Sequence, residues 1–383
     1  MHERSALGAA DVPDDTLASM VADLLQTGDA PLSLLSSYAE EVPYEIPAIT
    51  TAGRWWVRGE VSVDGHRHGF ALFVKQVHEW SRSPFFAHLP PEIQPWAAAQ
   101  VPWRTEGAVY RSDLGDHLPA GLALPRAVGV HDIDDLSYSV WLEVVPIEDV
   151  AWDLDRDRRA AHLLGRFAAH PGVRERVGIG DHEWDITSYV EGRLRFQVLP
   201  MLGEDAIWQH PLVEPGFGDL RDRLTQAAAD VDAIAAELME LPLLAGHGDA
   251  CANNLLVRPG RTGFTMIDFG FFTHLPVGFD LGQLLVGDVQ LGKRSAHDLL
   301  ERDEACLASY VDGLAVEGFD IAIEVVRRAH ALQLVLFTAL SSLPFEVLDA
   351  EPDEQLRAMA ASRAAIARHS LDLLDQTGPA QTG

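Results

Sequence analysis

The sequence predicts an α+β protein of two lobes: a small lobe with an antiparallel β-sheet and a helix, and a larger lobe that is mainly helical. Short runs rich in β-branched and aromatic residues fill residues 44–77, which is typical of a β-meander. Beyond residue 153 the apolar residues recur at helical spacing almost to the end of the chain. A chain of 383 residues is long enough to form two cores.

These patterns divide the chain into four segments. We expect a helical lead-in at residues 1–43, the small lobe at 44–143, the large lobe at 144–376 and a flexible tail at 377–383. In the first two segments, helices are expected at Thr16–Gln26 and Trp103–Leu114. Strands are expected at Ile46–Thr51, Arg54–Val63, Gly69–Val77, Gly121–Val130 and Tyr138–Val145, with a turn at Asp64–His68.

The third segment is predicted to contain six long helices. They are expected at Asp153–His170, Phe217–Leu241, Leu281–Leu291, Ala296–Leu314, Ile321–Leu340 and Glu354–Leu374. The longest stretch of low charge, Ala329–Leu343, is too short and too polar to span a bilayer, so we expect no membrane segment.

Composition excludes some classes of protein. A formal net charge of −29 argues against nucleic-acid binding, which needs clustered Lys and Arg residues. Such a field would attract a cationic small molecule, although a general acidic bias that aids solubility explains the charge equally well. Two cysteines, Cys251 and Cys306, form no disulfide framework, and no secretory signal is visible at the N-terminus. We therefore expect a cytoplasmic protein.

A strand of the small lobe ends in a lysine. The run from Phe70 to Val74 is mostly apolar, as in a central strand, and Lys75 follows it directly. A buried ammonium group is costly without an anionic partner. Either Lys75 is paired with an anion, or its charged end reaches solvent at the end of the strand.

The segment from Ala245 to Phe279 carries the chemistry. His247-Gly248-Asp249 is followed five positions later by Asn254, and a predicted β-hairpin then leads to Asp268-Phe269-Gly270. Transfer of a γ-phosphoryl group needs one carboxylate to orient the acceptor hydroxyl, and an amide oxygen and a second carboxylate to hold Mg²⁺. Taken singly, each side chain could instead serve as a turn cap or a local hydrogen-bond partner.

This pattern resembles the catalytic loop and D-F-G element of the protein-kinase-like fold, and its H-G-D opening is similar to that of the aminoglycoside phosphotransferase family. The resemblance implies that Asp249 orients the substrate hydroxyl and that Asn254 and Asp268 bind Mg²⁺. It further implies that His247 and Asp280 support the loop. The small lobe would bind the nucleotide, and the large lobe would carry the catalytic and substrate-binding residues.

By the same resemblance, Lys75 would bind the phosphates of ATP or GTP and pair with a helical glutamate. Glu106 is our choice for that glutamate, with Glu79 and Glu92 as competitors. The strand that ends near Val145 would run into a hinge at Glu143–Pro146, where the backbone of Glu143 and Val145 would contact the purine.

The chain departs from the family pattern in two places. Residues 250–253 contain none of the cationic side chains that usually follow the catalytic aspartate, so the phosphate charge would be less well neutralised. Cys251 stands there instead, either as a reactive thiol or, in our preferred interpretation, as a small packing residue. No G-x-G-x-x-G motif occurs between the first strands, and residues 50–54 are the nearest candidate for a phosphate loop.

The expected function is transfer of the γ-phosphate of a nucleoside triphosphate to a hydroxyl of a small antibiotic-like compound, such as an aminoglycoside. Residues 178–215 interleave aromatic and acidic side chains, which would suit a hydroxylated, amine-bearing acceptor. Two alternatives stay open: a metabolic kinase for a sugar or choline-type substrate, and a nucleotide-binding pseudokinase with a regulatory role. The sequence does not indicate the oligomeric state.

Overall fold

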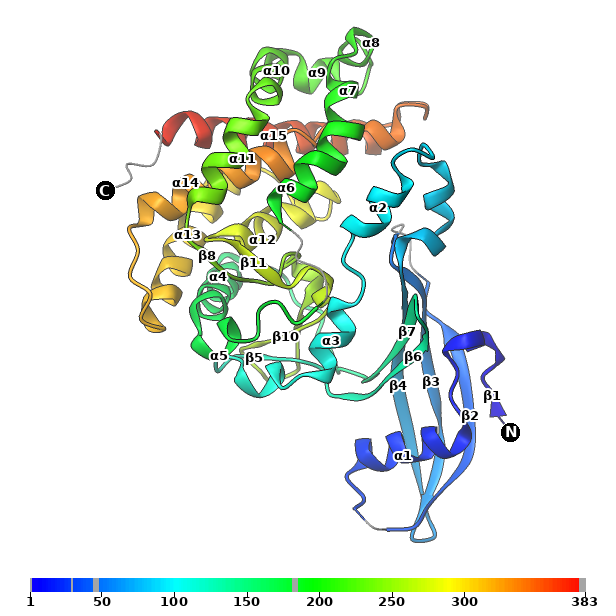
Figure 1. Cartoon of the computed structure of the whole chain (residues 1–383). Coiled ribbons are helices and arrows are strands. Elements are labelled where there is room, and N and C mark those ends of the chain that lie inside the picture. Colours follow the sequence, from blue (N-terminus) through cyan, green and yellow to red (C-terminus); the bar gives the residue numbers. More distant parts are fainter. Residues whose placement is uncertain (1, 29, 44–47, 181–184, 379–383) are drawn as a thin grey trace.

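A computed structural model describes residues 2–28, 30–43, 48–180 and 185–378 of the chain. It confirms the predicted α+β class, with a β-sheet in the small lobe and a larger, mainly helical lobe (Figure 1). Within the described residues no helix combines the length and the apolar character needed to cross a membrane.

The small lobe is built on a six-stranded sheet with the order β1-β2-β3-β4-β7-β6. Its strands are β1 (His2–Glu3), β2 (Leu32–Glu41), β3 (Thr51–Val63), β4 (His66–His78), β6 (Ala127–Asp134) and β7 (Ser137–Glu143). All neighbouring strands are antiparallel except β1, which runs parallel to β2. Because side chains alternate along a strand, Trp55 and Val57 of β3 face a different side of the sheet from Arg54 and Trp56.

One side of this sheet is covered by the N-terminal segment, which comprises a 3₁₀-helix, η1 (Ser5–Ala10), and α1 (Asp14–Leu25). Leu17 and Val21 of α1 are fully buried against Trp55 and Val57, which closes one core. The opposite side receives α3 (Thr105–Arg111) and faces the large lobe. The side that carries Arg54 and Lys75 therefore lines the space between the lobes.

Between β4 and α3 the chain forms an arm, residues 80–101. It contains two 3₁₀-helices and one α-helix: η2 (Trp80–Arg82), η3 (Pro84–His88) and α2 (Gln94–Gln100). Figure 1 shows α2 between the small-lobe sheet and the large lobe. The side chain of Trp96 lies beside Phe196 of the large lobe, with 5.9 Å between the ring centroids. The arm thus connects the two lobes.

The large lobe contains two small sheets, with the orders β5-β10-β9 and β11-β8. Their strands are β5 (Leu122–Ala123), β8 (Leu243–Gly246), β9 (Leu255–Val257), β10 (Phe264–Met266) and β11 (Thr273–Pro276). Short 3₁₀-helices stand beside them: η4 (Leu114–His117), η7 (Ala252–Asn254) and η8 (Phe269–Phe271). These sheets hold the ends of the segment that carries the predicted site.

Helices make up the rest of the large lobe. The long ones are α4 (Leu154–Ala169), α10 (Arg221–Ala229), α11 (Val231–Glu240), α12 (Phe279–Gln290), α13 (Leu299–Val316), α14 (Ile323–Leu334) and α15 (Glu354–Gln376). The shorter α-helices are α5 (Pro171–Arg174), α6 (Ile186–Tyr189), α7 (Leu199–Leu202), α8 (Asp205–Trp208) and α9 (Glu214–Phe217). Two 3₁₀ turns, η6 (Gly218–Leu220) and η10 (Phe345–Val347), and two π-helical segments, η5 (Val190–Val198) and η9 (Val335–Ala339), complete it.

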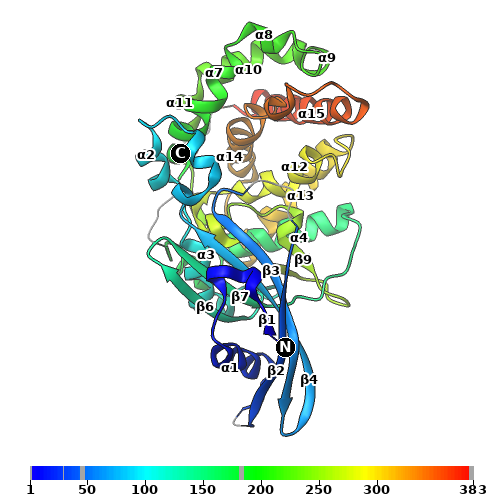
Figure 2. The same cartoon turned by 90° about the vertical axis from the view of Figure 1, so that its right-hand side faces the viewer.

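The helices around α7–α9 lie farthest from the small-lobe sheet, as Figures 1 and 2 both show. In the helical core, Asp303 of α13 contacts two histidines, His330 at 3.1 Å and His369 at 2.5 Å. This cluster is buried and lies outside the predicted site.

Several expected elements are wrong. Residues 32–41 form strand β2, so they are no part of a helical lead-in. Of the strand expected at residues 46–51, residues 46 and 47 lie outside the described residues, and residues 48–50 form no strand. The strand expected at Gly121–Val130 is two strands, β5 and β6, separated at Pro125, which has no N–H to donate. The helix expected at Phe217–Leu241 is interrupted at Asp230.

Candidate functional site

The buried end of β4 brings Lys75 to two carboxylates. Its Nζ lies 2.6 Å from Glu106 Oε2 and 2.9 Å from Asp268 Oδ1, and the lysine is only 6% exposed. Glu106 stands in the first turn of α3, whose Thr105 start follows Pro102 and Trp103. Of the glutamates considered from the sequence, the structure brings Glu106 to Lys75.

The three charges of this cluster stabilise one another. Burial opposes the charged form of Lys75, but Asp268 and Glu106 outweigh it and raise the pKa of Lys75 above its ordinary value. Lys75 in turn lowers the pKa of Asp268, whereas burial raises the pKa of Glu106 despite its cationic partner. Lys75 is thereby held in its charged form between two acids.

Loop 247–254 follows β8 and is fixed by Asp280 at the start of α12. The two carboxylate oxygens of Asp280 accept hydrogen bonds from the backbone N–H of His247 (2.8 Å) and of Gly248 (2.9 Å). Gly248 has a φ of +84°, and a Cβ there would lie 2.5 Å from the Cβ of Phe271. Only glycine fits this approach, because it combines a left-handed backbone with close packing.

His247 ties the same loop to the residues before Asp268. Its imidazole is fully buried, with Nε2 2.9 Å from the carbonyl oxygen of Ile267 and Nδ1 3.2 Å from the backbone N–H of Asp249. Nε2 therefore donates and Nδ1 accepts, which is the pattern of a neutral imidazole. A ring used in this way positions its neighbours and has no nitrogen left to act as a base.

Asp249, Asn254 and Asp268 converge at the mouth of the cleft. Asn254 Nδ2 donates to the backbone oxygen of Asp249 (2.8 Å) and to its Oδ2 (3.0 Å). The N–H of Ile267 donates to the carbonyl oxygen of Asn254 (3.1 Å), which brings Asp268 next to this pair. Asp268 itself has a left-handed backbone, with φ 64° and ψ 59°. Burial raises the pKa of Asp249 above its ordinary value.

The same groups fit a Mg²⁺ ion. Since Asn254 uses its amide nitrogen to bind Asp249, its carboxamide oxygen is the atom that could serve as a metal ligand. Mg²⁺ is commonly held by one or two protein oxygens, with phosphate and water oxygens completing its octahedron. No cluster of three His, Cys, Asp or Glu residues suited to a metal occurs in the part of the chain that the structure describes. Asn254 and Asp268 therefore suit a metal that arrives with a nucleotide.

Sequence reasoning missed one cation of the site, Arg54. It is the register partner of Lys75 across β3 and β4, so their side chains lie on the same side of the sheet. Its charge also helps to lower the pKa of Glu106 and of Asp268. Arg54 thus stands beside Lys75, at the end of the segment named as the phosphate-loop candidate.

The predicted hinge, Glu143–Pro146, begins at the last residue of β7. The N–H of Glu143 donates to the carbonyl oxygen of Arg126 (2.9 Å), and its carboxylate pairs with Arg258 (2.5 Å). Val145 lies two residues further on, in an extended linker.

Cys251, within loop 247–254, lies against α12. A Cβ at Gly287 of α12 would lie 3.1 Å from the Cβ of Cys251. Burial, reinforced by Asp249, raises the pKa of the thiol to about 12. A thiol that stays protonated is a poor nucleophile, which favours the packing interpretation.

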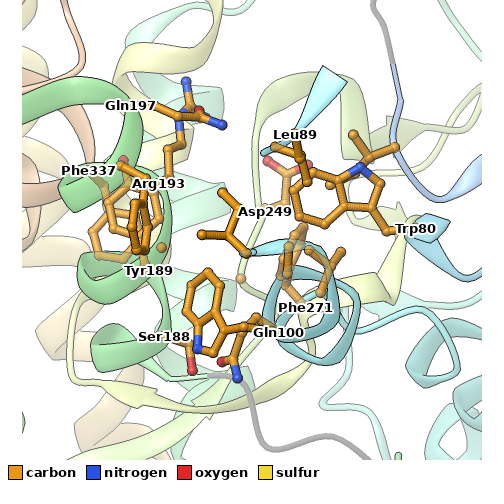
Figure 3. Close-up of a pocket in the computed structure, with 18 of the residues that line it drawn as sticks. Trp80, Leu89, Gln100, Ser188, Tyr189, Arg193, Gln197, Asp249, Phe271 and Phe337 are labelled. Atoms are coloured by element: carbon orange, nitrogen blue, oxygen red, sulfur yellow. The ribbon is translucent and has the colours of Figure 1, made fainter. Parts of the chain in front are cut away.

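A pocket of about 480 Å³ opens beside Asp249 between the two lobes. Figure 3 shows Tyr189 and Phe337 on one wall and Trp80 on the opposite wall. Aromatic side chains form a large part of its lining: Trp80, Trp96, Tyr189, Phe196, Phe271, Phe279 and Phe337. The polar lining residues are Gln100, Ser188, Arg193, Gln197, Asp249 and Gln283. Its position next to Asp249 makes it the candidate acceptor site.

Only some of the aromatic and acidic side chains of residues 178–215 line this pocket. Tyr189 and Phe196 line the pocket, whereas Trp208 is buried in the large lobe and donates to the carbonyl oxygen of Leu202. The acidic residues point elsewhere, since Glu191 pairs with Arg195, and Asp205 with Arg221. Trp184 and Glu183 lie outside the described residues.

Comparison with known proteins agrees with this geometry. A family model described as the phosphotransferase enzyme family matches residues 67–313, more than half of the chain. An aminoglycoside phosphotransferase structure from Alicyclobacillus acidocaldarius is 16% identical, with 97% of this chain and 98% of that chain covered and a TM-score of 0.55. An amicoumacin kinase structure with AMP-PNP, Ca²⁺ and Ami is 13% identical, with 90% of each chain covered and a TM-score of 0.48.

No sequence among curated proteins matches the chain. The family match nevertheless covers both Lys75 and the segment from Ala245 to Phe279, and the Alicyclobacillus structure shares the fold. The resemblance predicted from the sequence is therefore confirmed. The chain belongs to the phosphotransferase enzyme family and is a kinase-type phosphotransferase.

Proposed function

We propose that the protein transfers the γ-phosphoryl group of ATP or GTP to a hydroxyl group of a small antibiotic-like compound, in the cytoplasm, in a role in antibiotic resistance. The observation that carries this proposal is the convergence of Asp249, Asn254 and Asp268 next to the buried Lys75–Glu106 pair. Phosphoryl transfer depends mainly on positioning and on electrostatic stabilisation, because its transition state is loose. These residues supply both.

The nucleotide half of the site would use Lys75 for the phosphates, with Glu106 holding the ammonium group in place. Asn254 and Asp268 would hold Mg²⁺, which when bound offsets the charge on the phosphate oxygens. Arg54 would add the positive charge that loop 247–254 lacks. The carbonyl of Glu143 and the N–H of Val145 would contact the purine.

The acceptor half would use Asp249. Its carboxylate, held by Asn254, would orient the acceptor hydroxyl toward the γ-phosphorus and receive or pass on its proton. His247 and Asp280 would act only by fixing the loop that carries Asp249.

The proposal is tested by incubating the protein with Mg-ATP or Mg-GTP and a broad panel of hydroxylated compounds. Mass spectrometry should detect a product that carries one added phosphoryl group. Asp249→Ala should abolish that product while nucleotide binding persists, because Asp249 contacts the acceptor. Unchanged product formation by this variant would show that the role given to Asp249 is wrong.

The chain offers a matched pair for the metal site. Asn254→Ala should lower the turnover at least about 100-fold, because it removes a proposed Mg²⁺ ligand and the partner of Asp249. Asn253→Ala changes an exposed neighbour in the same 3₁₀ turn, whose side chain accepts a 3.4 Å hydrogen bond from Lys293, and should leave turnover unchanged. Equal effects of the two substitutions would contradict the assignment. Nucleotide binding without any transfer would instead support a regulatory pseudokinase.

A further inference from the structure

We propose that the acceptor is an uncharged, largely apolar ring compound that carries a hydroxyl group, rather than a polycationic aminoglycoside. This inference rests on the transferase function proposed above and names the substrate class of that same site. The site is the pocket of about 480 Å³ that opens beside Asp249.

The charges of the pocket are the first argument. Among the described residues that line it, Asp249 is the only carboxylate, and Arg193 is the only cation. An ammonium group that leaves water needs an anionic partner, or its desolvation costs more than its contacts return. A polycation would bring several ammonium groups to one carboxylate and would meet Arg193 as a like charge.

The net charge of −29 does not reverse this argument. At physiological ionic strength, interactions between exposed charges are largely screened beyond about 8 Å. On η5, the segment that contributes Arg193 and Phe196, the acidic Glu191 pairs with Arg195, which also contacts Asp232. The field of the whole protein can attract a cation to the surface, but the lining decides what enters the pocket.

The aromatic walls are the second argument. Tyr189 and Phe337 are stacked, with 4.0 Å between ring centroids and 18° between the planes, and Phe279 meets Phe337 edge-on at 5.0 Å. Trp80 stands on the opposite wall (Figure 3). Flat apolar surfaces that face each other across a cavity favour a ring between them, because its burial removes apolar area from water.

Two π-helical segments build these walls. Phe337 lies in η9, and Arg193 and Phe196 lie in η5. The π-helical turn is uncommon and is found preferentially at functional sites. Its occurrence in two separate helices, both of which contribute lining side chains, indicates that the aromatic surface is part of a binding site.

The arm of the small lobe closes the pocket from the other side. Trp96 packs so closely on Gly192 that a Cβ at Gly192 would lie 2.7 Å from the indole ring. Leu89 and Ile93 of the same arm add apolar lining. A ligand in the pocket would therefore be enclosed by apolar groups from both lobes, with Asp249 beside its hydroxyl.

The reaction that follows balances without a further reactant. The acceptor hydroxyl oxygen forms a bond to the γ-phosphorus, and the bond between the γ-phosphorus and the oxygen that bridges to the β-phosphorus breaks. The products are a phosphate monoester, a nucleoside diphosphate and the proton of the hydroxyl, which Asp249 receives or passes to solvent.

The test compares two uncharged compounds, chloramphenicol and erythronolide B, with two polycations, kanamycin and hygromycin B. Binding is followed by the fluorescence of the protein's tryptophans, since Trp80 and Trp96 line the pocket, and transfer is followed by mass spectrometry with Mg-ATP and Mg-GTP. We expect saturable quenching by an uncharged compound at a Kd at least about tenfold below that of either polycation, and phosphate addition to the uncharged compound.

The outcomes separate this inference from the proposed function. Preferential phosphorylation of kanamycin or hygromycin B overturns the acceptor class and leaves the transferase function intact. Binding of an uncharged compound with no transfer to any of the four overturns the transferase function and supports the preference of the pocket. Absence of binding by both uncharged compounds overturns the inference.

Two variants locate the effect. Phe337→Ala should raise the Kd of the uncharged compound at least about tenfold without changing nucleotide affinity. Arg193→Glu alters an exposed side chain, so it should fold normally, and it should strengthen kanamycin binding. Arg195→Ala, on the same η5 segment but paired with Glu191 and Asp232, is the control and should change neither. If both pocket variants bind every compound like the wild type, the acceptor lies elsewhere.

Discussion

Replacing Gly248 by alanine tests how loop 247–254 is positioned. Gly248 has a φ of +84°, and a Cβ there would lie 2.5 Å from the Cβ of Phe271 and 2.6 Å from its carbonyl oxygen. The left-handed backbone alone costs alanine roughly 1–2 kcal/mol. Because carbon atoms pack at about 3.5 Å or more, the loop must also move by about 1 Å, and Asp249 moves with it.

The expected loss can be worked from that displacement. A shift of about 1 Å at a reacting group costs about 100-fold in rate, which corresponds to about 2.7 kcal/mol of transition-state stabilisation. We therefore expect kcat/KM of Gly248→Ala to fall about 100-fold, mostly through kcat. The assay is the phosphoryl-transfer reaction, and circular dichroism with thermal unfolding establishes that the variant is folded.

Gly260→Ala is the matched control. Gly260 has a φ of +66°, so alanine meets a similar backbone penalty, but nothing lies within 4 Å of the added Cβ. This variant should lose some stability and keep the kcat/KM of the wild type. A folded Gly248→Ala protein with undiminished kcat/KM would refute the claim that packing on Phe271 positions Asp249.

Three further results are expected. Arg54→Ala should raise the KM for nucleotide at least about tenfold, because a charge-assisted contact to phosphate is lost. Arg58 lies further along the same face of β3 and is paired with an exposed glutamate, so Arg58→Ala should leave this KM unchanged. Cys251, with a pKa of about 12, should react with iodoacetamide at pH 8 about 100-fold more slowly than an ordinary thiol, and rapid alkylation seen by mass spectrometry would contradict that. Burial alone would raise the pKa of Asp303, but the two histidine partners outweigh burial and lower this pKa. The stability that the Asp303 carboxylate contributes is therefore present above the ordinary carboxyl pKa of about 3.9 and is lost as the pH falls. Asp303→Asn should therefore lower the Tm at pH 7 and flatten its fall between pH 5 and pH 3, as followed by calorimetry.

The predicted site residues that the structure brings together share one property: local spacing largely fixes their positions. Asp249 and Asn254 lie on one short loop, and a tight hairpin of β9 and β10 returns the chain so that Ile267 binds Asn254. Lys75 was recognised because a lysine on an apolar strand needs an anion. In each case a few neighbouring residues in the sequence were enough to predict the contact.

Elements whose position depends on distant partners were harder to predict. Strand β2 has two adjacent serines and no β-branched residue, so its own sequence gives little strand signal, and its pairing with β3 determines its structure. The break at Asp230 between α10 and α11 left the apolar periodicity intact, so the pattern read as one helix. Arg54 was missed because its role follows from its register with Lys75.

The acceptor pocket was the least predictable part for the same reason. Its walls come from the arm at residues 80–101, from η5 and from η9, and they become neighbours only when the two lobes fold. The acidic residues near η5 suggested a cationic acceptor, yet their ion pairs with arginines turn them away from the pocket. The spacing of residues in the sequence does not show which face of a π-helical turn lines a cavity.

Asp249 lies at the boundary between the charged cluster and the aromatic pocket, and the residues of these two parts can be substituted separately. On one side are the ion pairs of Lys75, Glu106 and Asp268, which under the proposed function would face phosphate and metal. On the other side are aromatic walls such as Phe337, which share no hydrogen bond with those ion pairs among the described residues. Substitutions at Tyr189 or Phe337 can change the acceptor without disturbing the charged half, because these residues lie on α6 and η9, apart from the segments that carry Lys75, Glu106 and Asp268. The acceptor is thus decided by the local lining of the pocket, which in this chain is mostly apolar.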